Sequence, residues 1–358
     1  MEKIKIGISI GDLNGIGPEV VIKTFMDERI LKWCIPIIYA SAKVISYHKN
    51  IVDNEFVFHP IRMDERPKDG VVNVKNCWQE NTTITLGKPT EESGKYAIKS
   101  LETAVQDLKA SKIDALVTAP MNKEALSLSG FQFPGHTEYL QSALGAKQSL
   151  MFLVSDEIRV GLVTNHLPLE EVAEHLSIEL IEAKFQIMEQ SLKVDFGIEK
   201  PRIAILGLNP HAGDGGVLGD EESKIILPAI MALKERGKLA IGPYSADGFF
   251  GSGNYKNFDG ILAMYHDQGL IPFKLLSFGS GTNFTAGLSA IRTSPDHGTG
   301  YDIAGKNEAD PTSFRTAVYK ALDFAKNRKE YYIDHANPVL KRNRFESGED
   351  EILSDIDE

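Results

Sequence analysis

The sequence predicts an α/β protein with a mainly parallel sheet that helices cover on both faces. Short β-branched or aliphatic runs end in polar, glycine or proline residues, as buried strands do. Segments with apolar residues at helical spacing separate these runs. Strands that alternate with helices favour parallel pairing, because each connecting helix packs back onto the sheet. The sequence shows no internal repeat.

The N-terminal part begins with a strand at Lys3–Ile10, followed by a tight turn at Gly11–Gly17. A helix then begins near Pro18, because proline fits the first helical turn and the acidic Glu19 interacts well with the helix dipole. The next apolar run, Ile35–Ala40, predicts a second strand.

Residues 51–88 have the pattern of a β-rich, irregular lobe beside the main sheet. Ser93 is expected to cap the helix that follows, since serine is a preferred N-cap residue, and this helix has one apolar face. That face consists of Ala97, Ile98, Leu101, Ala104, Val105 and Leu108. Asp114–Thr118 predicts the next strand.

The C-terminal part repeats the alternation. Strands are expected at Ile158–Val163, Ile203–Leu208 and Gly260–Met264, and helices at Leu169–Leu176, Glu179–Leu192 and Glu221–Arg236. Gly237 is a suitable C-cap for the third of these helices. Asp310 and Pro311 open a last long helix, whose core face is Phe314, Ala317, Val318, Ala321, Leu322 and Ala325.

A chain of 358 residues is long enough for one large or two modest domains. Its net charge is −11, but residues 345–358 hold seven acidic and no basic residues, so the remaining chain carries only −4. Such a segment is expected to be a disordered acidic tail that favours solubility. The negative net charge offers no general electrostatic attraction for the phosphates of nucleic acid.

The two cysteines, Cys34 and Cys77, form neither a disulfide framework nor a metal motif, and Cys34 is expected to be buried. This usage suits a reducing compartment. No apolar run approaches the roughly 18 residues that span a bilayer. The N-terminus leads directly into a strand rather than a signal peptide, so we expect a cytoplasmic protein without membrane partners.

Three histidines share one setting, since His166, His211 and His266 each follow a predicted strand. Ligands of open α/β sheets gather beyond the carboxyl ends of strands, so three imidazoles there could share one catalytic divalent cation. A single histidine in this position is more often an ordinary loop residue. The threefold repetition favours the metal site, although the pattern does not fix the geometry.

Several blocks resemble the 4-hydroxythreonine-4-phosphate dehydrogenase family, from Gly7 to about Phe314. They are Gly11-Asp12 with Gly15-Ile16-Gly17-Pro18-Glu19, Pro134-Gly135-His136-Thr137-Glu138, Thr164-Asn165-His166, Gly207-Leu208-Asn209-Pro210-His211-Ala212-Gly213, Tyr265-His266-Asp267-Gln268-Gly269, and Arg292-Thr293-Ser294-Pro295-Asp296-His297-Gly298-Thr299. The resemblance implies a fold similar to isocitrate and isopropylmalate dehydrogenases, with residues 1–344 forming one catalytic domain of two α/β subdomains and a cleft. It also implies a homodimer with the active site at the subunit interface.

The resemblance assigns roles to particular residues. The family's metal ligands fall on His166, His211 and His266, the residues that the strand pattern also selects. Its substrate-binding positions fall on His136, Thr137, Lys274, Asn283 and Arg292. Lysine and arginine can hold phosphate and carboxylate groups, and the other three side chains are directional hydrogen-bonding groups.

The implied activity is NAD-dependent oxidation of 4-phosphooxy-L-threonine to 2-amino-3-oxo-4-phosphooxybutanoate. That product decarboxylates to 3-amino-2-oxopropyl phosphate in pyridoxine 5'-phosphate biosynthesis. Zn²⁺ suits three nitrogen ligands best, while Co²⁺ and Mg²⁺ remain open. Asp247 and Asp267 are candidates for the catalytic base, and water activated by the metal is an alternative.

The cofactor site is less defined by the sequence. The glycines of Gly11–Gly17 do not follow the G-x-G-x-x-G spacing, so this turn is not assigned to a dinucleotide. The glycine-rich segment Asn283–Asp302 is the expected place for NAD, a cofactor that the resemblance alone implies.

Three other functions remain open. A related dehydrogenase could act on the 4-phosphate of a four-carbon sugar acid, threonate or erythronate, with the same histidines. A metal-dependent hydrolase could use the same three imidazoles to activate water. A non-catalytic metal-binding protein would take up the ion without turnover.

Overall fold

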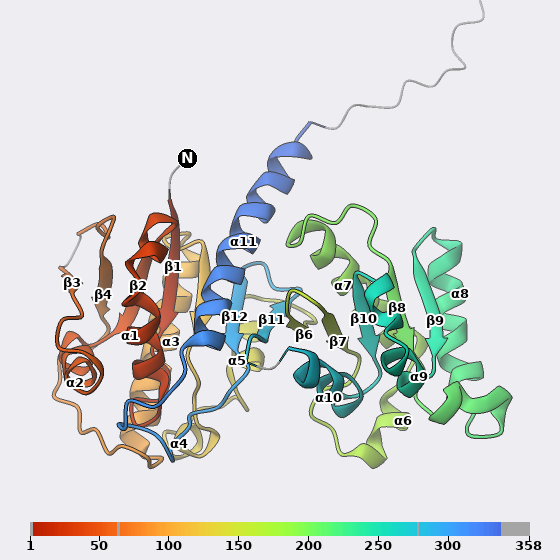
Figure 1. The fold of residues 1–358 in the computed structure, drawn as a ribbon, viewed down its shortest axis with the longest axis horizontal. Helices are drawn as coiled ribbons and strands as arrows, with labels where there is room; N and C mark the ends of the chain where they lie inside the picture. Colours follow the sequence, from red (N-terminus) through yellow and green to blue (C-terminus); the bar gives the residue numbers. More distant parts are fainter. Residues whose placement is uncertain (1–2, 63–64, 278, 338–358) are drawn as a thin grey trace, which may run out of the picture.

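A computed structural model describes residues 3–62, 65–277 and 279–337. Its centre is a 12-stranded sheet with the order β3-β4-β2-β1-β5-β12-β11-β6-β7-β10-β8-β9, and helices cover both faces (Figure 1). Antiparallel pairs in this sheet involve β6 or β11, and the other pairs are parallel. The predicted α/β class with a mainly parallel sheet is confirmed. The predicted acidic tail, residues 345–358, lies outside the described residues.

The strands are β1 Ile4–Ser9, β2 Cys34–Ala40, β3 Phe58–Ile61, β4 Val72–Asn76, β5 Ala115–Thr118, β6 Leu150–Val154, β7 Arg159–Leu162, β8 Ile203–Leu206, β9 Ala240–Tyr244, β10 Gly260–Ala263, β11 Thr282–Ala286 and β12 Ile291–Pro295. The α-helices are α1 Gly17–Phe25, α2 Ala42–Val52, α3 Glu91–Lys109, α4 Lys123–Leu128, α5 His136–Ala143, α6 Val172–His175, α7 Ile178–Val194, α8 Leu227–Glu235, α9 Ala246–Gly251, α10 His266–Leu276 and α11 Thr312–Asp334.

Each sheet face has its own core, because successive strand residues point to opposite faces. On β2, Ile38 joins the cluster that includes residues of α1 and α11, whereas Ile37 and Tyr39 pack with Leu101 of α3. The long helix α11 lies over the middle of the sheet (Figure 1). Its predicted core face is buried, as expected. None of the described helices is both long enough and apolar enough to cross a bilayer.

Residues 51–88 differ from the expected lobe. Strands β3 and β4 extend the main sheet at its edge, with β4 parallel to β2 and β3 parallel to β4. The predicted separate lobe is therefore wrong. The irregular appearance of the sequence comes from the connection between β3 and β4, whose proline and glycine residues separate two short strands that pair with each other and, through β4, with β2.

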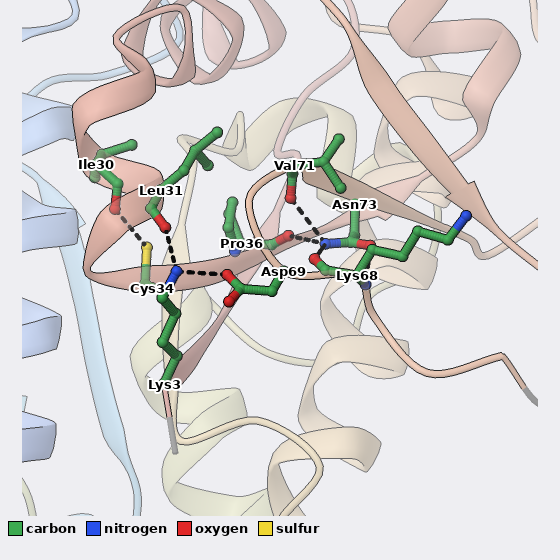
Figure 2. Close-up of polar contacts among 9 residues, drawn as sticks. All are labelled: Lys3, Ile30, Leu31, Cys34, Pro36, Lys68, Asp69, Val71 and Asn73. Carbon is green, nitrogen blue, oxygen red and sulfur yellow. Dashed lines mark hydrogen bonds and ion pairs between the residues drawn. The ribbon is translucent and has the colours of Figure 1, made fainter. Parts of the chain in front are cut away.

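This edge is held by polar side chains that bond to backbone carbonyls or to each other (Figure 2). Asn73 Nδ2 donates to the carbonyl oxygens of Lys68 at 2.9 Å and Val71 at 3.0 Å, and Lys3 Nζ bonds Asp69 Oδ1 at 2.6 Å. Nearby, Cys34 is buried as predicted, and burial raises the pKa of its thiol to about 12. A thiol in this environment is unreactive at neutral pH.

One helix begins differently from the prediction. Thr90, not Ser93, is the N-cap of α3, and its Oγ1 accepts from Ser93 N at 3.0 Å. Ser93 Oγ in turn accepts from Thr90 N, which completes a capping box. Ser93 occupies the third helical position, where a short hydroxyl can still return a hydrogen bond.

Because one histidine is buried, we expect the free energy of unfolding to fall at acidic pH. His48 on α2 is 3% exposed, and burial lowers the pKa of its imidazole to about 4. In the unfolded chain the pKa is near 6.5, so only the unfolded state takes up the proton between these values. The stabilisation is present above pH 6.5 and is lost as the pH falls through about 4, an effect of about 3 kcal/mol.

We therefore expect His48→Gln to flatten the fall in unfolding free energy between about pH 6.5 and 4. Urea unfolding at several pH values measures this slope. His175→Gln is the matched control, because His175 is exposed at the end of α6. An unchanged slope in the His48 variant would contradict the assignment.

Candidate active site

A cavity of about 250 Å³ lies where several elements meet near the middle of the sheet. The segment after β5, the start of α5 and strands β11 and β12 contribute to its wall. Five residues predicted from the resemblance line it, namely His136, Thr137, His166, Asn283 and Arg292. The cavity therefore gathers residues that are far apart in the sequence and suits a small metabolite.

Arg292 is the buried cation of this cavity. Its side chain on β12 is 3% exposed, and its Nη2 and Nε donate to Thr118 Oγ1 at 2.7 and 3.1 Å. Nη1 donates to Thr285 Oγ1 at 3.1 Å. No carboxylate of the described chain forms an ion pair with it, although the charge of Glu138 acts on it. Burial lowers the pKa of Arg292 to about 10, which still leaves a cation at neutral pH.

His136 stands beside this cation as a neutral group. It is the first residue of α5, and its Nε2 is shielded from solvent without a hydrogen-bond partner among the described residues. Burial and the charge of Arg292 hold the pKa of His136 well below its usual range. A buried polar atom without a partner is uncommon, and it is available to a bound molecule.

The three predicted metal ligands follow three neighbouring strands. Strand β10 pairs in parallel with β7 on one side and β8 on the other, so the carboxyl ends of all three lie at one edge. His166 follows β7 and His211 follows β8. His266, expected in a loop, is instead the first residue of α10. The sequence thus placed the histidines at the same sheet edge.

Two of these imidazoles are adjacent. The ring centroids of His166 and His266 are 5.7 Å apart. Burial, with the charges of Lys123 and His266, lowers the pKa of His166, which favours the neutral form that metals bind. His266 Nδ1 lies 2.7 Å from Asp267 Oδ1. Asp267, one predicted base, therefore contacts a predicted ligand.

His211 does not complete this group within the single chain. The described residues contain no group of three histidine, cysteine or acidic side chains that could hold an ion. The charge of His211 instead acts on Asp247, the other predicted base, whose pKa is lowered mainly by a hydrogen bond from Ser245. Asp247 is thus an ionised carboxylate near His211.

Lys274 lies outside the cavity lining and faces Asp296, with 3.8 Å between Nζ and Oδ1. Burial raises the pKa of Asp296, while the charges of Lys274, His297 and His266 oppose this effect. The predicted substrate-binding lysine therefore belongs to an adjacent polar cluster rather than to the wall of the cavity.

Sequence reasoning missed several polar residues near the site. Lys123, Glu138, Thr118 and Ser294 line the cavity, and Asp296 faces Lys274. Glu138, Ser294 and Asp296 stand inside the motif blocks, so they could have been selected there. Thr118 ends a predicted strand, the position that identified the histidines. Lys123 has no comparable sequence signal.

The fold is α/β, and its cavity has a buried guanidinium in the wall and room for a small molecule. A family model described as pyridoxal phosphate biosynthetic protein PdxA matches residues 32–321. The chain belongs to this family. Because its relatives are named as dehydrogenases, it is an oxidoreductase.

A 4-hydroxythreonine-4-phosphate dehydrogenase of Bacteroides thetaiotaomicron is 49% identical, over 95% of this chain and 94% of that protein. A D-threonate 4-phosphate dehydrogenase of Cupriavidus necator is 37% identical, over 90% of this chain and 96% of that protein. A solved structure of a putative 4-hydroxythreonine-4-phosphate dehydrogenase from Salmonella typhimurium has a TM-score of 0.78 and 33% identity, and the match covers 90% of this chain and all of that one.

Proposed function

We propose that this protein oxidises the C3 hydroxyl of 4-phosphooxy-L-threonine and passes the hydride to NAD. The product, 2-amino-3-oxo-4-phosphooxybutanoate, then loses carbon dioxide to give 3-amino-2-oxopropyl phosphate for pyridoxine 5'-phosphate biosynthesis. The observation that carries this proposal is the buried Arg292 guanidinium, which has hydroxyl partners but no carboxylate partner in the described chain. Relatives named for this substrate support the choice.

The substrate-binding residues have complementary roles in this proposal. Arg292 holds one oxyanion of the substrate, because a guanidinium can form two parallel charge-assisted bonds. His136 Nε2, Thr137 and Asn283 give the hydrogen bonds that orient the molecule. Lys274 adds positive charge next to the cavity, although Asp296 partly balances it.

The histidines fit a divalent cation, because His166 and His266 are adjacent and the pKa shift of His166 favours a neutral ring. We propose that His166, His211 and His266 hold it, with Zn²⁺ the most suitable ion and Co²⁺ or Mg²⁺ as alternatives. The cation would supply positive charge next to the substrate hydroxyl oxygen. Since one chain does not bring all three rings together, we propose a homodimer whose active site lies at the subunit interface.

Removal of the hydroxyl proton requires an acceptor within hydrogen-bond reach. Asp267 is bonded to His266, and Asp247 is an ionised carboxylate near His211, so each is a candidate base. NAD is proposed to lie along the segment Asn283–Asp302, part of which forms the cavity wall. The free thiols of the two cysteines suit a cytoplasmic location.

An absorbance assay at the NADH band tests this proposal. We expect faster NADH formation with 4-phosphooxy-L-threonine than with threonate or erythronate 4-phosphate, and little formation after treatment with a chelator. Faster turnover of an amine-free acid would favour a second candidate function, a dehydrogenase of a four-carbon sugar-acid 4-phosphate. The Cupriavidus relative is the specific support for this candidate. Phosphate release without NAD would indicate a hydrolase, and metal uptake without any turnover would indicate a binding protein.

A further inference from the structure

The backbone that carries His211 has an unusual left-handed course. His211, Ala212, Gly213, Asp214 and Gly215 have consecutive φ values of 55°, 52°, 82°, 43° and 66°. Residues with a Cβ atom rarely adopt this conformation, and a run of them persists only when surrounding groups hold it.

Glu222 makes three hydrogen bonds to the residues that lead into this segment. Its Oε1 accepts from Leu208 N and Asn209 N, both at 2.7 Å, and its Oε2 accepts from Asn209 Nδ2 at 3.0 Å. Burial alone would raise the pKa of Glu222, but the hydrogen bonds from Asn209 and Leu208 outweigh it and lower the pKa. An ionised carboxylate thus anchors the two residues that precede Pro210.

The left-handed run also packs closely against this carboxylate. A Cβ atom at Gly213 would lie 2.7 Å from Glu222 Oε2, and one at Gly207 would lie 3.1 Å from Oε1. Glycine at both positions lets the backbone fold around the anchor. The anchor is therefore built into the segment on both sides of His211.

Two further side chains link the neighbouring strand ends. Gln268 accepts from Met264 N at 2.7 Å and donates to Gly207 O at 2.6 Å, which joins the end of β10 to the end of β8. Thr164 Oγ1 donates to Met264 O at 2.7 Å, which joins the segment after β7 to the end of β10. These bonds connect the three backbone segments that precede the histidines.

We infer that Glu222, Gln268 and Thr164 are positioning residues that set the relative placement of the segments carrying His166, His211 and His266. This inference rests on the proposed metal-binding role of those histidines. The links from Gln268 and Thr164 meet at Met264, and Glu222 anchors Leu208 and Asn209, the residues directly after Gly207. Each link acts through the backbone of one chain, so it presets that chain's histidines for an ion that two subunits share. Loss of supporting hydrogen bonds around a site typically lowers metal affinity about 10- to 100-fold.

Zn²⁺ titration of the metal-free full-length protein against a coloured chelator tests the inference. The variants are Glu222→Gln, Gln268→Glu and Thr164→Val, each close in shape to the original residue. Thr164→Ser keeps the hydroxyl and should restore affinity. Glu19→Gln is the matched control, because Glu19 is a buried carboxylate on α1 whose Oε1 accepts from Ala309 N at 2.8 Å. Thermal unfolding of every variant reports its stability.

We expect Glu222→Gln and Gln268→Glu to raise the Zn²⁺ dissociation constant by about 10- to 100-fold. Thr164→Val should weaken binding less, because Thr164 N still donates to Met264 O. Glu19→Gln should lower Tm without changing Zn²⁺ affinity. Amide exchange should also increase over residues 207–216 in the Glu222 variant, a readout that needs no metal.

Two results would overturn the inference in different ways. If the parent protein binds Zn²⁺ and the Glu222 and Gln268 variants bind it equally well, the positioning role is wrong while the metal site stands. If Glu19→Gln loses as much Zn²⁺ affinity as the Glu222 and Gln268 variants, the loss reflects general destabilisation, and the positioning role is again wrong. If the parent protein binds no Zn²⁺, the proposed metal site fails as well.

Discussion

Replacing His166 with alanine is expected to reduce turnover by roughly a thousandfold or more and to remove bound divalent metal. The ring of His166 is adjacent to that of His266, and its lowered pKa keeps the nitrogen lone pair free at neutral pH. A metal ion adjacent to a reacting oxygen contributes several kcal/mol to the rate, and about 1.4 kcal/mol corresponds to a factor of ten. NADH formation and elemental analysis of the purified protein measure the two effects. His211→Ala and His266→Ala should give the same result.

The control for this experiment is His175→Ala, because His175 is exposed on α6, outside the motif blocks and the cavity lining. It should retain parental activity and metal content. Near-parental turnover by a chelator-treated variant lacking His166, His211 and His266 would show that the imidazoles have no part in the reaction. If the alanine variants are inactive but keep their full metal content, the imidazoles act in catalysis without being needed to bind the ion.

The strands that precede these histidines could be predicted because their signal is local. Ile158–Val163, Ile203–Leu208 and Gly260–Met264 are short apolar runs, and the structure has β7, β8 and β10 inside them. A strand buried on both faces needs a continuous apolar run, and polar or glycine residues mark its end. The setting of the histidines at one sheet edge followed from that local pattern.

The antiparallel strands could not be predicted in the same way. Strands β6 and β11 pair with each other although about 130 residues separate them in sequence, and β12 lies between β11 and β5. Such pairing depends on partners brought together by the whole fold. The sequence predicts a separate lobe in place of β3 and β4 for the same reason, because the turns around these strands are evident in the sequence and their pairing is not.

The burial of Arg292 also depends on tertiary structure. Its hydroxyl partner Thr118 is 174 residues away in sequence. An arginine considered alone is ordinarily a solvated surface charge. The resemblance selected this residue for substrate binding, but only the folded chain shows a buried guanidinium without an ion-pair partner in the described residues. That arrangement leads to the second large expected effect.

Arg292→Met is expected to raise the KM for the phosphorylated substrate by roughly 30-fold to several thousandfold. Truncating one member of a buried, hydrogen-bonded charge pair costs about 2–5 kcal/mol of binding, and the bound oxyanion would be the partner that loses its cation. Methionine fills much of the space of the arginine stem, so the cavity wall is retained. Steady-state kinetics with varied substrate measure the change, and Arg292→Lys should be intermediate because it keeps the charge but not the fork of donors.

The sign of the stability change separates a substrate-binding arginine from a structural one. In the chain without substrate, the buried guanidinium has only neutral hydroxyl partners, so its desolvation is poorly compensated. We therefore expect the Tm of Arg292→Met to equal or exceed that of the parent, while KM rises. Functional sites commonly hold such destabilising groups. A large fall in Tm with an unchanged KM would show that Arg292 supports the sheet, and that the substrate's oxyanion is held elsewhere.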